Sequence, residues 1–172
     1  ISSFLTFADF DKDGLEDILC AFCKDGRIKG PDRDTRNGQN TILFARRLDA
    51  SGAKWENHSW GPYPQSFKIA EAADVNQDGK LDIVCSSVNA ARAPEVESGV
   101  FWLELSGDFP SKPTLTFHDI SGDPGVKFDL TVTMDMDGDG DVDVLTSEEA
   151  QRIGKNEHNE GLGVVWYENP LK

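Results

Sequence analysis

The 172-residue sequence predicts an all-β fold made of repeated antiparallel units. Three observations support this fold class. An acidic nine-residue pattern begins at Asp9, Asp74 and Asp135, at intervals of 65 and 61 residues. Short runs of apolar and β-branched residues flank each copy, which favours strands over helices. Further runs of the same kind follow at matching places, and such a period is typical of repeat architectures.

The clearest copy of the acidic pattern spans residues 135–143. It places carboxylates at positions one, three, five and nine, namely Asp135, Asp137, Asp139 and Asp143. Gly140 at position six permits a sharp turn, which usually needs a positive φ. The carbonyl of Asp141 at position seven would be a further oxygen ligand. Calcium takes about six to eight hard oxygen ligands, so this spacing predicts a calcium site.

The same pattern occurs twice more. The first copy carries Asp9, Asp11, Asp13 and Asp17, and the second carries Asp74, Asn76, Asp78 and Asp82. Asn76 offers an amide oxygen at position three. The alternative is a set of acidic turns without an ion, but three copies in register favour calcium, because close carboxylates repel one another without a cation.

These loops differ from EF-hands, which need a bidentate Glu at position twelve and a helix on each side. Position twelve is held by Cys20, Cys85 and Thr146. Each loop is therefore predicted to connect two strands. The chain has three cysteines, an odd number, so they cannot all be paired in disulfides within the chain. Cys20 and Cys85 are expected to be small buried residues, and a Cys20–Cys23 metal or redox pair is the less supported alternative, since a second pair is missing.

Each unit is predicted to contain up to four strands. The expected strands are 4–8, 18–22, 41–45 and 54–60 in a unit of residues 1–64, followed by 66–70, 81–88, 99–105 and 114–120 in 65–125, and by 126–132, 142–146 and 161–169 in 126–172. A turn is expected at 61–64. A repeated four-stranded antiparallel unit is typical of a β-propeller blade.

The chain is thus predicted to be a single propeller segment of about three blades over residues 1–172. Propellers need about four to eight blades. We therefore expect the propeller to be completed by other blades of a longer chain or by a second copy. The start at Ile1 agrees with a segment cut from something longer.

The acidic composition limits the partners. The formal charge is −14, and three bound calcium ions would bring it to −8. Nucleic-acid binding needs a basic surface, so we expect no nucleic-acid partner. Because no apolar run is long enough to span a bilayer, we also expect no membrane insertion.

Several polar residues are candidates for chemistry. Glu148 and Glu149 are not a ready acid–base pair, since neighbouring strand residues point to opposite faces. They are interpreted as solvated loop acids, because such acids are common in loops and no base partner is identified. His58 and His118 hold equivalent positions and are expected to be structural. His158 lies in a loop outside the repeat pattern and is the best single candidate for chemistry, although a surface histidine is the simpler interpretation.

The side chains of the four tryptophans could stack on sugar rings. Trp102 and Trp166 share a repeated third-strand position, which favours packing between blades. Trp55 is left open. Trp60 and Tyr63 lie beside Gly61 and Pro62 and are predicted to be surface aromatics.

The pattern from Ala73 to Val84 resembles the FG-GAP/VCBS repeat, which builds calcium-binding β-propellers such as the integrin α-chain head. The resemblance implies up to three calcium ions. It implies ligands at the carboxylate and amide positions above, with carbonyls of Leu15, Lys80 and Asp141. The Phe-Gly and Gly-Ala-Pro signatures are absent. Residues 163–170 instead resemble a VCBS-type subgroup of secreted and surface proteins, some attached to carbohydrate-active enzymes.

The resemblance implies a secreted, cell-surface or periplasmic binding or scaffold domain for glycan or protein ligands. The alternative is a propeller domain of a carbohydrate-active lyase or dehydratase, similar to aldos-2-ulose dehydratase. In that case Arg33, Arg36, His158, Glu148 and Glu149 would line the ring face. An integrin-like adhesion head is a third interpretation. Motifs of common hydrolases and phosphate-binding loops are absent.

Overall fold

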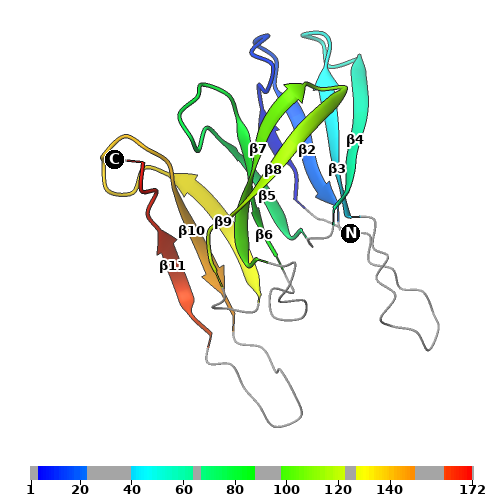
Figure 1. Cartoon of the computed structure of the whole chain (residues 1–172). Coiled ribbons are helices and arrows are strands. Elements are labelled where there is room, and N and C mark those ends of the chain that lie inside the picture. The colour runs from blue at the N-terminus through cyan, green and yellow to red at the C-terminus, as the bar shows by residue number, and fades with distance from the viewer. Residues whose placement is uncertain are drawn as a thin grey trace, which may run out of the picture.

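The structure is a computed structural model that describes residues 4–22, 40–63, 67–87, 98–122, 127–149 and 161–171. These residues form eleven strands in three antiparallel sheets that stand side by side (Figure 1). The sheets are consistent with propeller blades, which confirms the predicted fold class. Within the described residues, no helix has the length and apolar character needed to cross a membrane.

The first sheet follows chain order. Its strands are β1 (Thr6–Ala8), β2 (Asp17–Phe22), β3 (Asn40–Arg47) and β4 (Trp55–Tyr63). The turn predicted at 61–64 is wrong over residues 61–63. Tyr63 pairs with Asn40 after a register shift, so β4 continues through this stretch. Gly61 has a φ of 130°, a value that glycine adopts without steric cost.

The second sheet has the same order, and the third has one strand fewer. The second contains β5 (Ile69–Ala73), β6 (Asp82–Ser86), β7 (Val100–Asp108) and β8 (Lys112–Asp119). The third contains β9 (Phe128–Met134), β10 (Asp143–Glu148) and β11 (Gly163–Tyr167), with β10 in the middle. Strands β5 and β9 start later than predicted and extend up to the acidic loops, because Ala73 and Met134 pair with Asp82 and Asp143.

The core lies between the sheets. One buried cluster joins the first sheet to the second and includes Leu19, Phe44, Ile83 and Phe101. A smaller cluster joins the second sheet to the third. Strand β5 contacts β1 and β2, and β9 contacts β5 and β6, so the first strands of the sheets adjoin. This is the arrangement of neighbouring propeller blades, each of which buries its faces against the next.

The second and third sheets approach closely at Gly99. The ring of Phe128 is fully buried. A Cβ atom at Gly99 would lie 2.0 Å from Cε2 of that ring. A real Cβ cannot approach another carbon so closely, so Gly99 sets the distance between the two blades at this point.

Of the two predicted surface aromatics, Trp60 is buried and Tyr63 is half-buried. Trp60 is only 5% exposed, and its ring stacks on Phe44 with centroids 5.0 Å apart. The Trp60 Nε1–H donates to the carbonyl of Pro110 in the β7–β8 hairpin at 3.0 Å. Tyr63 is half-buried against Phe67. The second sheet therefore covers these aromatics, which the sequence order alone does not show.

The outward face of the third sheet is exposed and apolar. Leu130, Val132 and Trp166 lie on this face, and Trp166 is 45% exposed. Trp102 holds the equivalent place in the second sheet and packs against the second core cluster. The expected burial of Trp166 is therefore wrong, because no described segment packs on the outer side of the third sheet.

The first sheet also exposes its outer face. Phe7 and Leu43 are exposed there, and Cys20 on the same face is half-buried. The expectation of a buried Cys20 is therefore wrong in degree. Cys85 is fully buried between the first two sheets, as expected, and burial raises the pKa of its thiol well above the ordinary value. Both are free thiols, and Cys23 lies outside the described residues.

Candidate metal centres

The three acidic loops join the first and second strands of their sheets. They lie at the same end of the sheets, toward the top of Figure 1. Gly14, Gly79 and Gly140 at position six have φ values of 87°, 84° and 96°. Each of these amides donates to the aspartate at position one of its own loop, at 2.9–3.0 Å. The predicted positive-φ turn is therefore present in every copy.

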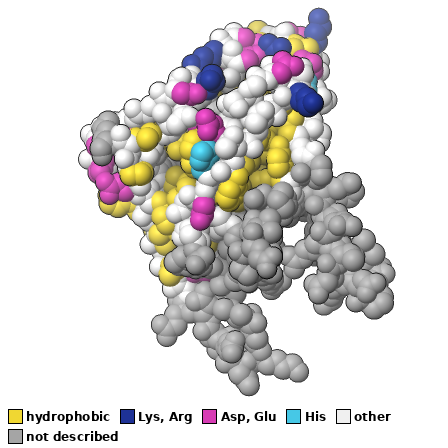
Figure 2. Space-filling model, in the orientation of Figure 1, with side chains coloured by type: hydrophobic (Ala, Val, Ile, Leu, Met, Phe, Trp, Pro, Cys, Tyr) yellow, Lys and Arg dark blue, Asp and Glu magenta, His cyan; other side chains and the backbone are white. Residues whose placement is uncertain are grey.

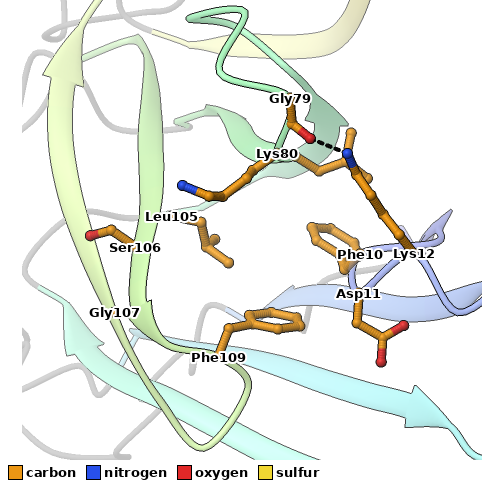
Figure 3. Close-up of a pocket in the computed structure, with 10 residues that line it drawn as sticks. Phe10, Asp11, Lys12, Gly79, Lys80, Leu105, Ser106, Gly107 and Phe109 are labelled. Atoms are coloured by element: carbon orange, nitrogen blue, oxygen red, sulfur yellow. Dashed lines mark hydrogen bonds between the residues drawn. The ribbon is translucent and has the colours of Figure 1, made fainter.

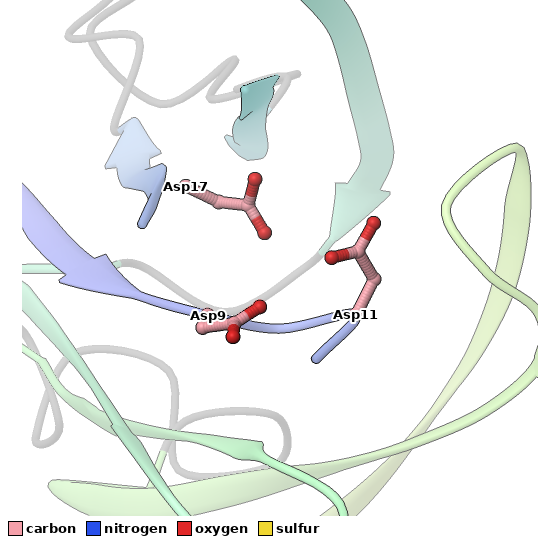
Figure 4. A group of neighbouring side chains, drawn as sticks. All are labelled: Asp9, Asp11 and Asp17. Carbon is pink, nitrogen blue, oxygen red and sulfur yellow. The ribbon is translucent and has the colours of Figure 1, made fainter. Parts of the chain in front are cut away.

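Two loops bring three carboxylates together. Oxygens of Asp9, Asp11 and Asp17 lie within 4.8 Å of one another, and Figure 4 shows these side chains converging from the loop and the start of β2. Asp135, Asp137 and Asp143 form the same arrangement in the third loop. Clustered carboxylate oxygens are the donor set that calcium takes.

The second loop has the same backbone with an amide in place of one acid. Asn76 Oδ1 accepts the amide of Asp78 at 3.0 Å, as Asp11 and Asp137 accept the amide two residues on in their loops. Oδ1 of Asp74 is buried and has no hydrogen-bond partner. An unsatisfied buried carboxylate oxygen is costly, and a cation would satisfy it. The second loop therefore fits a cation as well.

The aspartate at position nine is the most buried member of each loop. Asp17, Asp82 and Asp143 are exposed to 0%, 1% and 1%. One oxygen of each accepts the amide at position two of the loop, at 3.0–3.2 Å. The other accepts an amide of the third strand or the residues just after it, at 2.8–3.1 Å. This carboxylate therefore fastens the loop to the sheet.

The sequence pattern predicts these residues only as ligands and does not reveal the fastening role. The sequence feature that could have indicated this role is the Asp at the first residue of each second strand, namely Asp17, Asp82 and Asp143. A carboxylate at the head of a buried strand needs partners. Each oxygen keeps a second lone pair, so the role leaves metal ligation open.

The pKa values of these buried carboxyls differ. Burial raises the pKa of Asp17, and burial raises that of Asp82 to about 6 against the opposing hydrogen bonds from Leu105 and Val75. For Asp143, burial acts upward, but hydrogen bonds from Asn169 and Met136 bring its pKa below the ordinary value. Without a cation, burial therefore makes the ionised forms of Asp17 and Asp82 less favourable than that of Asp143.

The remaining predicted ligands are not part of the two triads. The carboxylates at position five, Asp13, Asp78 and Asp139, accept the amide two residues on at 2.8–3.0 Å. The carbonyls of Leu15, Lys80 and Asp141 stay predictions. Asp141 is 2% exposed, in contrast to the exposed Lys80.

Positively charged side chains pair with aspartates of the first and second loops. Arg46 of β3 places Nη2 2.5 Å from Oδ2 of Asp11. Lys80 pairs with Asp78 of its own loop at 3.2 Å. The Arg46 guanidinium offsets part of the charge of the first triad, because opposite charges at this distance attract strongly when partly buried.

An open cavity of about 300 Å³ separates the first two loops from the β7–β8 hairpin. Phe10, Leu105 and Phe109 give it an apolar floor, and Lys12 and Lys80 lie at its rim (Figure 3). Lys12 Nζ donates to the carbonyl of Gly79 across this space. In Figure 2, charged side chains gather toward this end, and hydrophobic side chains are exposed below them.

The candidate acids Glu148 and Glu149, at the end of β10 and just after it, have structural contacts. Glu148 belongs to β10 and is 3% exposed, so its interpretation as a solvated loop acid is wrong. Its carboxylate accepts the amides of Lys127 and Leu162, at 3.4 and 2.6 Å. Glu149 is exposed and pairs with the Lys127 ammonium. Glu148 therefore holds together the segments that flank β10.

The two repeated histidines lie against third-strand aromatics. His118 stacks on Trp102 with ring centroids 4.1 Å apart, and His58 lies 6.2 Å from Phe44. Each also approaches a glutamate, Glu104 at 2.9 Å and Glu56 at 3.4 Å. Their equivalence supports the structural interpretation. Arg33, Arg36 and His158 lie outside the described residues.

Comparison with known proteins agrees with the loop geometry. Residues 9–85 match the family model described as FG-GAP-like repeat, a stretch that includes the first two acidic loops. No curated protein and no solved structure gives a significant match to the chain. The triad of Asp9, Asp11 and Asp17 lies within this match, and the triad of Asp135, Asp137 and Asp143 lies outside it; both could hold a metal ion, as is typical of FG-GAP calcium sites.

Proposed function

Because residues 9–85 form an FG-GAP-like repeat, we propose that the chain is a calcium-binding propeller segment that acts outside the cell as a binding or scaffold domain. The observation that carries the proposal is the recurrence of one loop geometry at one end of three blades, with two converged aspartate triads. Calcium-binding modules outside the cell often have dissociation constants of about 10⁻⁴–10⁻³ M, which suits a secreted, surface or periplasmic location.

Up to three ions would be held, one in each loop. The triads supply the carboxylates in the first and third loops, and Asp74, Asn76 and Asp82 supply the oxygens in the second. A bound calcium ion contributes positive charge that offsets carboxylate repulsion. The fastening aspartates transmit this stabilisation to the sheet, because they bond both the loop and the third-strand side.

The proposed partners include further blades. Val164 is 81% exposed on the third sheet, beside Leu130 and Trp166. The equivalent faces of the first two sheets are buried against their neighbours. These exposed faces support a larger propeller that is completed by blades of a longer chain or by a second copy. Sedimentation would test the second case, in which the mass would exceed that of one chain.

The proposed ligands are glycans or proteins. Trp55 is an exposed aromatic on the first sheet, with Nε1 held by the carbonyl of Gly52 at 2.9 Å. Its fixed ring could stack on a sugar. The buried Trp60 is not available for this. A glycan array compared with Trp55→Ala would separate glycan binding from protein binding.

Calcium binding is tested by thermal melting in excess calcium and in excess chelator. A site held at about 100 times its dissociation constant adds about 2.7 kcal/mol. One kcal/mol shifts the melting temperature by about 2–4 °C at this chain length. We expect a loss of at least about 5 °C on chelation, restored by calcium. Equal melting curves would contradict the proposal.

The lyase or dehydratase alternative predicts a reaction. Glu148 is already engaged by two backbone amides, which leaves that carboxylate poorly placed for acid–base work. Incubation with uronic-acid polysaccharides or dehydratable keto-sugars would yield an unsaturated, ultraviolet-absorbing product if the alternative were right. Binding without such a product would favour the scaffold role.

A further inference from the structure

Neighbouring acidic loops are joined by a repeated side-chain contact. The residue at position four of one loop donates to the carbonyl of the position-six glycine in the next loop. Lys12 Nζ donates to Gly79 O, as Figure 3 shows, and Gln77 Nε2 donates to Gly140 O at 3.2 Å. The two contacts join residues that are 67 and 63 positions apart in the chain.

The backbone at position four is held in an uncommon conformation. Lys12 and Gln77 have φ values of 60° and 57°, and they are the non-glycine residues with positive φ in the described chain. Such a conformation is uncommon outside glycine, so the loop must over-determine it. Both side chains leave their loops from the same backbone conformation, and each reaches the following loop.

The contact connects parts of the loops that calcium would order. Position four lies between the predicted ligands at positions three and five, such as Asp11 and Asp13. The accepting carbonyl of Gly79 lies between Asp78 and Lys80 in the same way. Ordering either loop therefore lowers the entropy cost of the contact, and the formed contact lowers the cost of ordering the other loop.

We propose that Lys12 and Gln77 couple the calcium sites of adjacent blades, so that the three loops fill cooperatively. This inference rests on the proposed calcium function and adds how the sites influence one another. The third loop has Gly138 at position four and lacks a side chain to continue the series. Lys12 and Gln77 act as positioning residues, since they are not themselves predicted ligands.

The test follows the amide NMR signals of Gly14, Gly79 and Gly140 during a calcium titration of the whole chain. In the unaltered chain the three signals are expected to change over one narrow calcium range. Gln77→Met and Lys12→Met remove the donors. A lost hydrogen bond of about 1 kcal/mol corresponds to a three- to tenfold change in affinity, so the midpoints should separate by about that factor.

Matched variants distinguish the contact from charge and size. Lys12→Gln removes the same charge as Lys12→Met but keeps a donor, and Gln77→Lys exchanges one donor for the other. Both are expected to retain the narrow titration. Gln77→Leu also removes the donor without adding charge and is the second loss variant if Gln77→Met does not fold.

The outcomes separate the two proposals. Equal midpoints in the loss variants and the unaltered chain would overturn the coupling while leaving calcium binding intact. Signals that do not respond to calcium in the unaltered chain would overturn the calcium function itself, and the coupling with it. Separated midpoints in the methionine variants, together with narrow titrations in the donor-keeping variants, would establish the coupling.

Discussion

The first and third acidic loops have the same backbone but different charges around it. In the first, the Arg46 guanidinium lies 2.5 Å from Asp11. Ile18 and Val144 are equivalent, since each follows the position-nine aspartate of its loop. Ile18 pairs with Ala45 and Val144 pairs with Tyr167, so Glu168 in the third blade is equivalent to Arg46 in the first. A calcium ion entering the first loop therefore competes with the Arg46 guanidinium, whereas the residue at the matching register position of the third blade is an acid. Equal motifs therefore need not bind with equal affinity.

The next residue along the chain also differs between the two blades, Arg47 in the first and Asn169 in the third. Asn169 Nδ2 donates to the carbonyls of Val142 and of Val75 in the second loop, at 3.2 and 2.9 Å. Its counterpart Arg47 bonds the carbonyls of Asp49 and Ala50, within its own β3–β4 hairpin. A residue that follows β11 thus ties the third loop to the second loop, whereas the counterpart in the first sheet, Arg47, bonds only within its own hairpin.

The largest expected effect tests what the two loops share. Asp17→Ala and Asp143→Ala each remove the partner of two backbone amides. Each unpaired buried group costs about 1–3 kcal/mol, so with two such groups each variant should lose about 2–6 kcal/mol of unfolding free energy. Urea unfolding in excess chelator measures the loss. Unequal losses would mean that the fastening differs between the blades.

A medium effect tests the tie between the third loop and the second. Asn169→Leu removes two donated hydrogen bonds, and we expect a loss of about 1–2 kcal/mol. Hydrogen exchange should quicken in the second and third loops. The control is Arg47→Leu, which should quicken exchange only in the β3–β4 hairpin. Faster exchange in the third loop of the control would contradict the comparison.

The smallest effect tests the internal cation. Arg46→Met removes the guanidinium from Asp11 without shortening the side chain much. Because the pair is partly exposed, its worth is about 1 kcal/mol or less. Calcium affinity of the first loop should rise by up to about fivefold, read from the Gly14 amide signal. Lys54→Met is the matched change of charge at an exposed site, and an equal rise there would leave no special role for Arg46.

The repeat made much of this fold predictable. The acidic pattern at Asp9, Asp74 and Asp135 located the loops, and flanking β-branched residues located all eleven strands to within a few residues. Both signals are local, because a loop turn and a strand depend on residues close in sequence. The positive φ of Gly140 followed from the same local constraint.

The errors come from contacts between distant residues. The position of Trp60 beside Gly61 and Pro62 predicts a surface residue. The next blade nevertheless covers Trp60, and its Pro110 carbonyl accepts a hydrogen bond from the indole. Glu148 was expected in solvent, yet amides on both sides of β10 need its carboxylate. The contacts of Lys12 and Gln77 cross between repeats and have no local signature.

The close contact of Gly99 with Phe128 has a consequence for exchanging blades. The position of Gly99 is held by Thr41 in the first blade and by Gly163 in the third, as the pairing of Ile18, Ile83 and Val144 shows. A ring that lies 2.0 Å from where a Cβ would stand admits only glycine. The first blade therefore cannot replace the second in front of Phe128. At this interface the size of one side chain, and not the repeat pattern, decides which unit can pack against Phe128.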